Sequence, residues 1–157
     1  MRSTQIPHPG SHPADQVSQV RPSLPSGHRP IVFFDGECVM CNGFVDLMLR
    51  LDPQAKILLA PLQGKTAQQY LPPQPSNQRE WTLYYLTTEG LFDRSEAVLR
   101  ICGDLDHWMR LFSVFRVIPL PLRDSLYRFV AQHRYDWFGK RDSCRRPTPE
   151  DQAHFLP

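Results

Sequence analysis

Three groups of apolar positions open the ordered part of the chain. Residues 31–34 form a continuous Ile-Val-Phe-Phe run flanked by proline and Asp-Gly, which predicts a buried strand ending in a turn. Over residues 38–51 the apolar side chains recur every three or four positions, which predicts an amphipathic helix. A second short apolar run over 57–60 predicts another buried strand. We therefore expect a right-handed βαβ crossover with parallel strands.

Shorter elements continue the pattern. We predict a helix over 63–71, then a strand over 81–86 that turns back through a hairpin into 91–92. A further helix, with Ser95 as its N-cap, should end near residue 103. The resulting order, β-α-β-α-β-β-α, is that of the thioredoxin fold. The predicted fold class is therefore α/β, thioredoxin-like, with a mixed four-stranded sheet.

Two further helical stretches, 107–117 and 123–138, predict a C-terminal helical extension. Five side chains of the second stretch recur at helical spacing, and we expect the face that they form to pack against the rest of the domain. These residues are Leu126, Phe129, Val130, His133 and Trp137.

Composition divides the chain into three parts. Residues 1–29 are rich in Pro, Ser, Gln and His with few large apolar side chains, which predicts a disordered tail. Residues 30–146 are predicted to form one thioredoxin-like domain with its C-terminal helices, and residues 147–157 a second tail. A chain of 157 residues has room for one ordinary core.

Charge and hydropathy narrow the classes of partner. The net charge is +2, with basic and acidic residues interspersed, so we expect neither nucleic acid nor a membrane as a partner. No apolar run approaches the roughly 18 residues that cross a bilayer, and the N-terminus lacks the apolar segment of a secretory signal. We therefore expect a soluble, cytoplasmic protein.

Two of the four cysteines, Cys38 and Cys41, directly follow the first predicted strand. Cys38 then lies in the opening turn of a helix, where unpaired backbone N–H groups and the helix dipole stabilise a thiolate. Cys41 lies one turn later and can reach the first sulfur. We interpret the pair as the attacking and resolving thiols of a thiol-disulfide oxidoreductase without a cofactor. Its substrate would be a protein or low-molecular-weight thiol or disulfide, with a thiol reductant as electron donor.

Two other classes of function remain open. The same spacing binds Zn or Cu(I) through two thiolates, although the chain has no second Cys-x-x-Cys to complete a closed zinc site, and we assign no metal ligands. Alternatively, the domain is a non-catalytic module that binds a partner.

Acidic residues flank the dithiol. The negative charges of Asp35 and Glu37 oppose thiolate formation. Asp35 is a candidate proton relay for Cys41; the alternative is that it only bonds backbone N–H groups of the turn. The strand-end Asp-Gly-Glu also partly matches the Asp-x-Asp nucleophile motif of haloacid-dehalogenase phosphatases, but the second acid is Glu and cysteines follow it.

More distant residues are secondary candidates. Cys144 is a candidate third thiol that folds back toward Cys38. Ser95 is a candidate substrate-binding residue, because it and neighbouring N–H groups can receive the carboxylate of a glutathione-like thiol. Cys102 is expected to be a small buried side chain. Tyr135 and its aromatic neighbours are expected to serve packing alone.

Three segments carry a family resemblance. They are Asp35-Gly-Glu-Cys38-Val-Met-Cys41, Ser95-Glu-Ala97 and the closing stretch 127–144. Together they resemble the DCC family, named for its Asp-Cys-Cys motif, over about residues 30–144. The resemblance implies a thiol-disulfide oxidoreductase with Asp35, Cys38 and Cys41 as its functional trio. One departure from thioredoxin is that the nearest proline before the third strand is Pro75, so the cis-proline that holds thioredoxin substrates has no direct counterpart.

Overall fold

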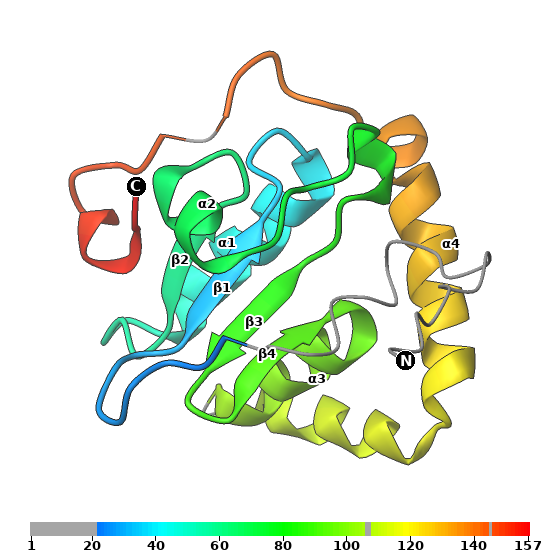
Figure 1. The fold of residues 1–157 in the computed structure, drawn as a ribbon, viewed down its shortest axis with the longest axis horizontal. Helices are drawn as coiled ribbons and strands as arrows, with labels where there is room; N and C mark the ends of the chain where they lie inside the picture. Colours follow the sequence, from blue (N-terminus) through cyan, green and yellow to red (C-terminus); the bar gives the residue numbers. More distant parts are fainter. Residues whose placement is uncertain (1–21, 106–107, 145) are drawn as a thin grey trace, which may run out of the picture.

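The computed structural model describes residues 22–105, 108–144 and 146–157 and contains a four-stranded mixed sheet (Figure 1). The sheet order is β2-β1-β3-β4; β1 pairs with β2 in parallel, and β3 pairs antiparallel with β1 and β4. The predicted thioredoxin-like α/β fold is confirmed. The strands are β1 (Ile31–Phe34), β2 (Leu58–Pro61), β3 (Tyr84–Thr87) and β4 (Gly90–Asp93).

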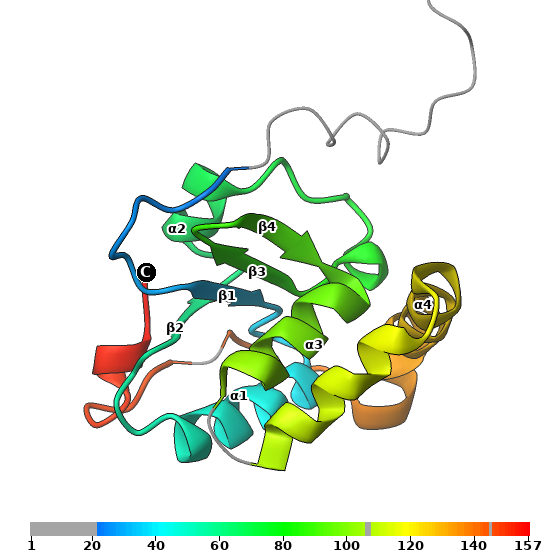
Figure 2. The ribbon, with the colours of Figure 1, turned by 90° about the horizontal axis from the view of Figure 1, so that it is seen from below.

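Helices cover both faces of the sheet (Figure 2). Side chains alternate along β1, so Val32 and Phe34 pack in one core cluster with residues of α1 and α3. Ile31 and Phe33 belong to a second cluster with Ala67 of α2 on the opposite face. This packing holds the C-terminal end of β1 in place, and the residues of the candidate site directly follow it. The three helices are α1 (Val39–Leu51), α2 (Lys65–Tyr70) and α3 (Arg94–Asp104).

The C-terminal helical extension runs along the outer edge of the domain (Figure 1). It consists of the 3-10 helix η3 (Trp108–Val117) and the α-helix α4 (Leu120–Phe138). Residue 107 of the predicted helix lies outside the described residues, and the rest of it is 3-10 rather than α. α4 begins earlier than predicted because Pro121 lies in its first turn, where the missing N–H costs no hydrogen bond.

Most of the face of α4 that we predicted to pack on the domain lies in solvent. Leu126, Phe129 and Trp137 are exposed, whereas Ala131 and Arg134 are buried against the domain. The expectation that the apolar stripe packs on the domain is therefore wrong for these three exposed side chains, whereas Val130 does line a cavity of the domain. The physical reason is that inward polar side chains find specific hydrogen-bond partners within the domain.

Short segments outside the predicted domain also pack on it. The Leu24 N–H donates to the Thr87 carbonyl at 2.9 Å, and Leu24 is buried beside the sheet. After the short 3-10 helix η4 (Gln152–His154), the Leu156 N–H donates to the Leu59 carbonyl at 2.8 Å. Leu24 and Leu156 thus contact the predicted domain from outside its bounds, whereas the prediction for residues 1–21 lies outside the described residues. In the described ranges, no helix is both long and apolar enough to span a membrane.

Candidate active site

The dithiol lies at the junction of β1 and α1. After β1 ends, the turn 35–37 leads to Cys38, which is the N-cap residue of α1. The Cys41 N–H donates to Cys38 Sγ at 3.3 Å, so the sulfur takes the place that a Ser or Asp oxygen has at many helix starts. Both cysteines are free thiols. The structure thus brings the two predicted sulfurs together on one helix start.

The two thiols differ in their tendency to ionise. The pKa of Cys38 falls to about 7, mainly because the Cys41 thiol donates a hydrogen bond to its sulfur. The Cys41 N–H and the charge of Arg134 also lower this pKa, whereas desolvation and the charge of Asp35 oppose the fall. The pKa of Cys41 is raised, because Cys38 holds its proton and because it is desolvated. Cys38 is therefore the thiol that ionises near neutral pH.

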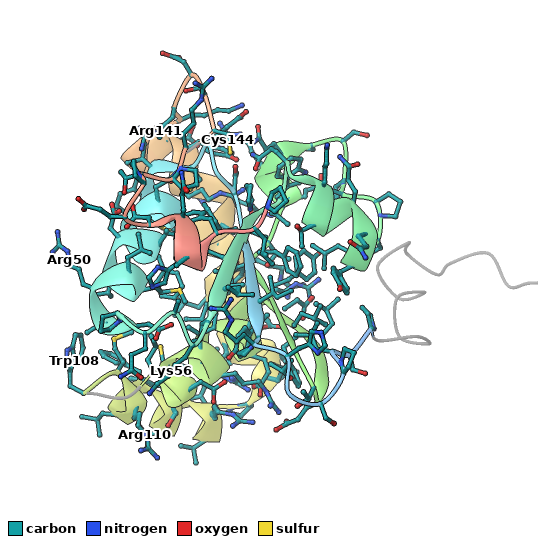
Figure 3. The ribbon with its side chains drawn as sticks, turned by 90° about the vertical axis from the view of Figure 1, so that its left-hand side faces the viewer. Arg50, Lys56, Trp108, Arg110, Arg141 and Cys144 are labelled. Atoms are coloured by element: carbon teal, nitrogen blue, oxygen red, sulfur yellow. The ribbon has the colours of Figure 1, made fainter. Side chains whose placement is uncertain are left out.

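Access to Cys38 is restricted. Cys38 is 0 % exposed, whereas Cys41 is half-buried. Residues 139–144, which we call the closing strap, leave the end of α4 and run beside the dithiol loop (Figure 3 labels Arg141 and Cys144). The strap pairs with Cys38 through an antiparallel bridge at Lys140. Because Cys38 is buried, a substrate sulfur can reach it only after neighbouring residues shift.

Backbone and side-chain contacts hold the closing strap in place. The Val39 N–H donates to the Gly139 carbonyl at 3.4 Å, and the Arg141 N–H donates to the Glu37 carbonyl at 2.8 Å. Lys140 Nζ lies 3.0 Å from Glu37 Oε2 in an exposed ion pair. Hydrogen bonds from Gln78 and Lys140 lower the pKa of Glu37, so its negative charge is matched locally by a cation.

Asp35 follows β1 and is 2 % exposed. Its Oδ1 accepts hydrogen bonds from Gln63 Nε2 at 2.9 Å, from the Glu37 N–H at 3.1 Å and from Gln78 Nε2 at 3.3 Å. A bond to a backbone N–H of the turn is therefore present, but it is not the sole contact of Asp35, and the role of Asp35 as a proton relay stays a prediction. The two glutamine partners were not indicated by the sequence, because they come from separate segments that only the fold brings together.

Arg134 and Tyr135 of α4 complete the surroundings of Asp35. Arg134 is 3 % exposed, and its Nη2 lies 3.2 Å from Asp35 Oδ2 in a buried ion pair. The Tyr135 hydroxyl donates to the same oxygen. Arg134 also donates to the backbone carbonyls of Gln78 and Trp81, both at 2.9 Å. Sequence reasoning gave Tyr135 a packing role only and did not single out Arg134, which lies 99 residues from its partner.

Comparison with known proteins places this site in a family. A family model described as DCC1-like thiol-disulfide oxidoreductase matches residues 32–140. The chain belongs to this family. It is 34 % identical over 128 residues to the uncharacterized protein YuxK of Bacillus subtilis (strain 168), with 81 % of this chain and 93 % of that protein covered. It is 32 % identical over 132 residues to a chloroplastic DCC family protein of Arabidopsis thaliana, with 83 % and 77 % covered. No solved structure matches.

A small cavity lies behind the dithiol of this DCC1-like domain. Its volume is about 50 Å³, enough for a few water molecules at roughly 10–15 Å³ each. Asp35, Cys41 and Arg134 line it, but apolar side chains make up most of its surface. These are Met40, Trp81, Leu83, Val130 and Ala131. The cavity therefore brings the Cys41 thiol and the Asp35 carboxylate to the same small and mainly apolar space.

Cys144 lies outside the matched range of the DCC1-like family but close to the dithiol loop. Its Sγ packs on Gly36, where an added Cβ would collide with the sulfur. The same sulfur lies 4.0 Å from Gln63 Oε1. The structure thus brings Cys144 next to the turn that precedes Cys38, and its participation as a third thiol stays a prediction.

The remaining candidates lie elsewhere. Ser95 is in the first turn of α3, whose N-cap is Asp93, so the predicted cap is two residues too late. Its hydroxyl donates to the Asp124 carboxylate of α4, and its role in substrate binding stays a prediction. Cys102 is buried in the core, where desolvation raises its pKa. In the part of the chain that the structure describes, no three His, Cys, Asp or Glu side chains gather to hold a metal.

Proposed function

We propose that this DCC1-like protein is a thiol-disulfide oxidoreductase in which Cys38 attacks and Cys41 resolves. The observation that carries the proposal is the sulfur of Cys38 at the start of α1, hydrogen-bonded by Cys41 and with a pKa of about 7. Its substrates are protein or low-molecular-weight thiols or disulfides, a thiol compound is its reductant, and it works in the cytoplasm.

The reaction moves two electrons from the dithiol to the substrate disulfide. Cys38 and Cys41 each lose one proton, and the two substrate thiolates each take one up from solvent. The Cys38 thiolate attacks one sulfur of a substrate disulfide, whose S–S bond breaks and releases the first substrate thiolate. Cys41 then loses its proton and attacks Cys38 Sγ, which breaks the mixed disulfide and releases the second substrate thiolate. The product is a Cys38–Cys41 disulfide, which the thiol reductant returns to the dithiol by the reverse exchange.

Asp35 is the proposed acceptor for the proton of Cys41. It lines the same cavity as Cys41, and water in that cavity would connect the thiol to its carboxylate. Arg134 and Tyr135 hold Oδ2 of the carboxylate, while two glutamine side chains and a backbone N–H hold Oδ1. Arg134 is therefore a positioning residue that also lowers the pKa of Cys38 through its charge.

Trapping tests the proposal most directly. A Cys41→Ser variant should accumulate a mixed disulfide through Cys38 when it is incubated with oxidised glutathione, because the resolving thiol is missing. A variant with both Cys38→Ser and Cys41→Ser is the matched control and should trap none. Site-resolved mass spectrometry reads both results. Trapping through Cys102 or Cys144 alone would overturn the assignment of the nucleophile.

The alternative functions give different results in the same preparation. A metal-binding module would show one bound Zn or Cu(I) per dithiol in native mass spectrometry and no Cys38–Cys41 disulfide after mild oxidation. A partner-binding module would keep its cellular function after Cys38→Ser. Either result would overturn the oxidoreductase proposal.

A further inference from the structure

Asn42 is a buried amide near the start of α1, four residues after Cys38. It is 3 % exposed. Its Nδ2 donates a hydrogen bond to the Gly36 carbonyl at 2.9 Å and another to the Cys38 carbonyl at 2.8 Å. One side chain of the helix therefore holds two points of the turn that leads into the dithiol.

The two donated bonds account for the presence of this amide inside a helix. Asparagine is unfavourable in helix interiors, because its side chain competes for backbone hydrogen bonds. Asn42 uses that tendency, since its Nδ2 bonds backbone carbonyls of the preceding turn. Its buried Oδ1 has no hydrogen-bond partner among the described protein groups. The contribution of Asn42 therefore comes through Nδ2.

The turn before α1 is held by polar groups from several segments. The Gly36 N–H donates to Gln63 Oε1 at 3.2 Å, and the Cys38 N–H donates to the Asp35 carbonyl at 3.2 Å. The Gly36 carbonyl is the group for which Asn42 supplies the donor. Gly36 is buried, so loss of the amide would leave this carbonyl without that partner and favour a rearrangement of the turn.

The turn sets the direction of the Cys38 sulfur. As the N-cap residue, Cys38 has an extended backbone with φ −77° and ψ 121°, and in this conformation its Sγ accepts from the Cys41 N–H at 3.3 Å. Sulfur is a weak acceptor, so this bond alone does little to fix the backbone. The bonds from Asn42 lie on both sides of residue 37 and hold the chain where Cys38 can cap the helix.

We propose that Asn42 is a positioning residue for thiol-disulfide exchange, because its amide fixes the turn so that Cys38 Sγ stays directed at Cys41. The inference rests on the proposed function, in which Cys38 is the attacking thiol. The Cys41 thiol and then the Cys41 N–H lower the pKa of Cys38. A sulfur that turns away from these donors is less stable as a thiolate and ionises at higher pH.

The pH dependence of Cys38 alkylation tests this role in the full chain. Asn42→Leu removes both donors at similar volume and should move the midpoint upward from near pH 7 by about half a pH unit or more. Asn42→Asp should move it further, because a carboxylate repels the two carbonyls and its negative charge opposes the thiolate. Iodoacetamide labelling read by mass spectrometry gives each profile. Each profile is normalised to its own plateau, so altered access to the buried thiol leaves the midpoint unaffected.

Two further variants separate positioning from stability. Val45→Ala deletes buried apolar contacts three residues further along α1, so it should lower the free energy of unfolding in urea and leave the midpoint unchanged. Asn42→Ser keeps one donor, since a serine hydroxyl in a helix can bond the carbonyl four residues earlier. It should give a midpoint between those of the unchanged protein and Asn42→Leu. Asn42→Ser and Asn42→Asp also carry the test if Asn42→Leu does not fold.

Two results would overturn the positioning role. One is a folded Asn42→Leu or Asn42→Asp variant with an unchanged midpoint, and the other is an equal upward shift in Val45→Ala. The trapping experiment with Cys41→Ser distinguishes this failure from failure of the proposed function. Trapping through Cys38 together with unchanged Asn42 midpoints would refute the positioning role alone. Shifted midpoints without any trapping through Cys38 would refute the oxidoreductase function and leave only a local structural effect of Asn42.

Discussion

The two faces of α4 use opposite chemistry. The inward face carries Arg134 and Tyr135, which bind the buried carboxylate at the end of β1. The outward face carries Leu126, Phe129 and Trp137, which touch solvent. In an ordinary surface helix the apolar stripe faces the core and the polar side faces water. The inversion indicates that α4 is held largely by specific polar contacts rather than by burial of its apolar stripe.

Removing the Arg134 cation from the inward face of α4 should cause the largest loss of unfolding free energy. Arg134→Met leaves Asp35 buried without its charge partner, so the free energy of unfolding should fall by about 3–5 kcal/mol. Urea unfolding measures the loss. Arg134→Met combined with Asp35→Asn should recover part of it, because no buried charge is then left unpaired. A cost no larger than that of a surface substitution would contradict the polar anchoring of α4.

Placing glutamine on each face compares them directly. Ala131→Gln forces a larger polar side chain into the buried face and should cost about 1–3 kcal/mol of unfolding free energy. Leu126→Gln changes a residue already in solvent and should stay within about 0.5 kcal/mol. The same urea titration measures both variants, and equal costs would show that the two faces are not distinct.

The charge on the inward face should control the ionisation of Cys38. Thiolate forms as pH rises, so the alkylation rate of Cys38 should be low in acid, reach half its maximum near pH 7 and then level off. Arg134→Met should move this midpoint upward and Asp35→Asn downward, because the two charges act in opposite directions. Iodoacetamide labelling read by mass spectrometry gives the profile. Shifts of the same sign in both variants would contradict this assignment.

A charge reversal just after the end of α4 should have the smallest effect, and that effect is on the alkylation rate of Cys38. Lys140→Glu replaces the exposed ion pair with Glu37 by a repulsion, which loosens the closing strap over Cys38. Such exposed pairs contribute about 0.2–1 kcal/mol, so the alkylation rate should rise about fivefold at most. Arg146→Glu, just beyond the strap, makes the same charge change and should leave the rate unaltered. A matching rise in both variants would point to net charge rather than to the strap.

The positions of the two cysteines at the start of α1 could be predicted from the sequence. A continuous apolar run, a turn and an amphipathic repeat are contiguous signals, and they placed Cys38 and Cys41 on one helix start. The orientation of α4 did not follow, because periodicity identifies an apolar stripe without saying whether the domain or a partner covers it. The bonds of Asp35 to Gln63 and Arg134 join distant segments and leave no local pattern. The packing of Leu24 was missed because a single apolar residue in a proline-rich stretch gives no periodic signal.

The last residues have a consequence for self-association. β2 is an edge strand, and edge strands offer unpaired backbone groups on which a neighbouring molecule can add a strand of its own. Phe155 and Leu156 already occupy this position through their bridge and hydrogen bond to Leu59. This short segment therefore protects the edge of the sheet, and its removal would allow β2 of one copy to pair with a strand of another.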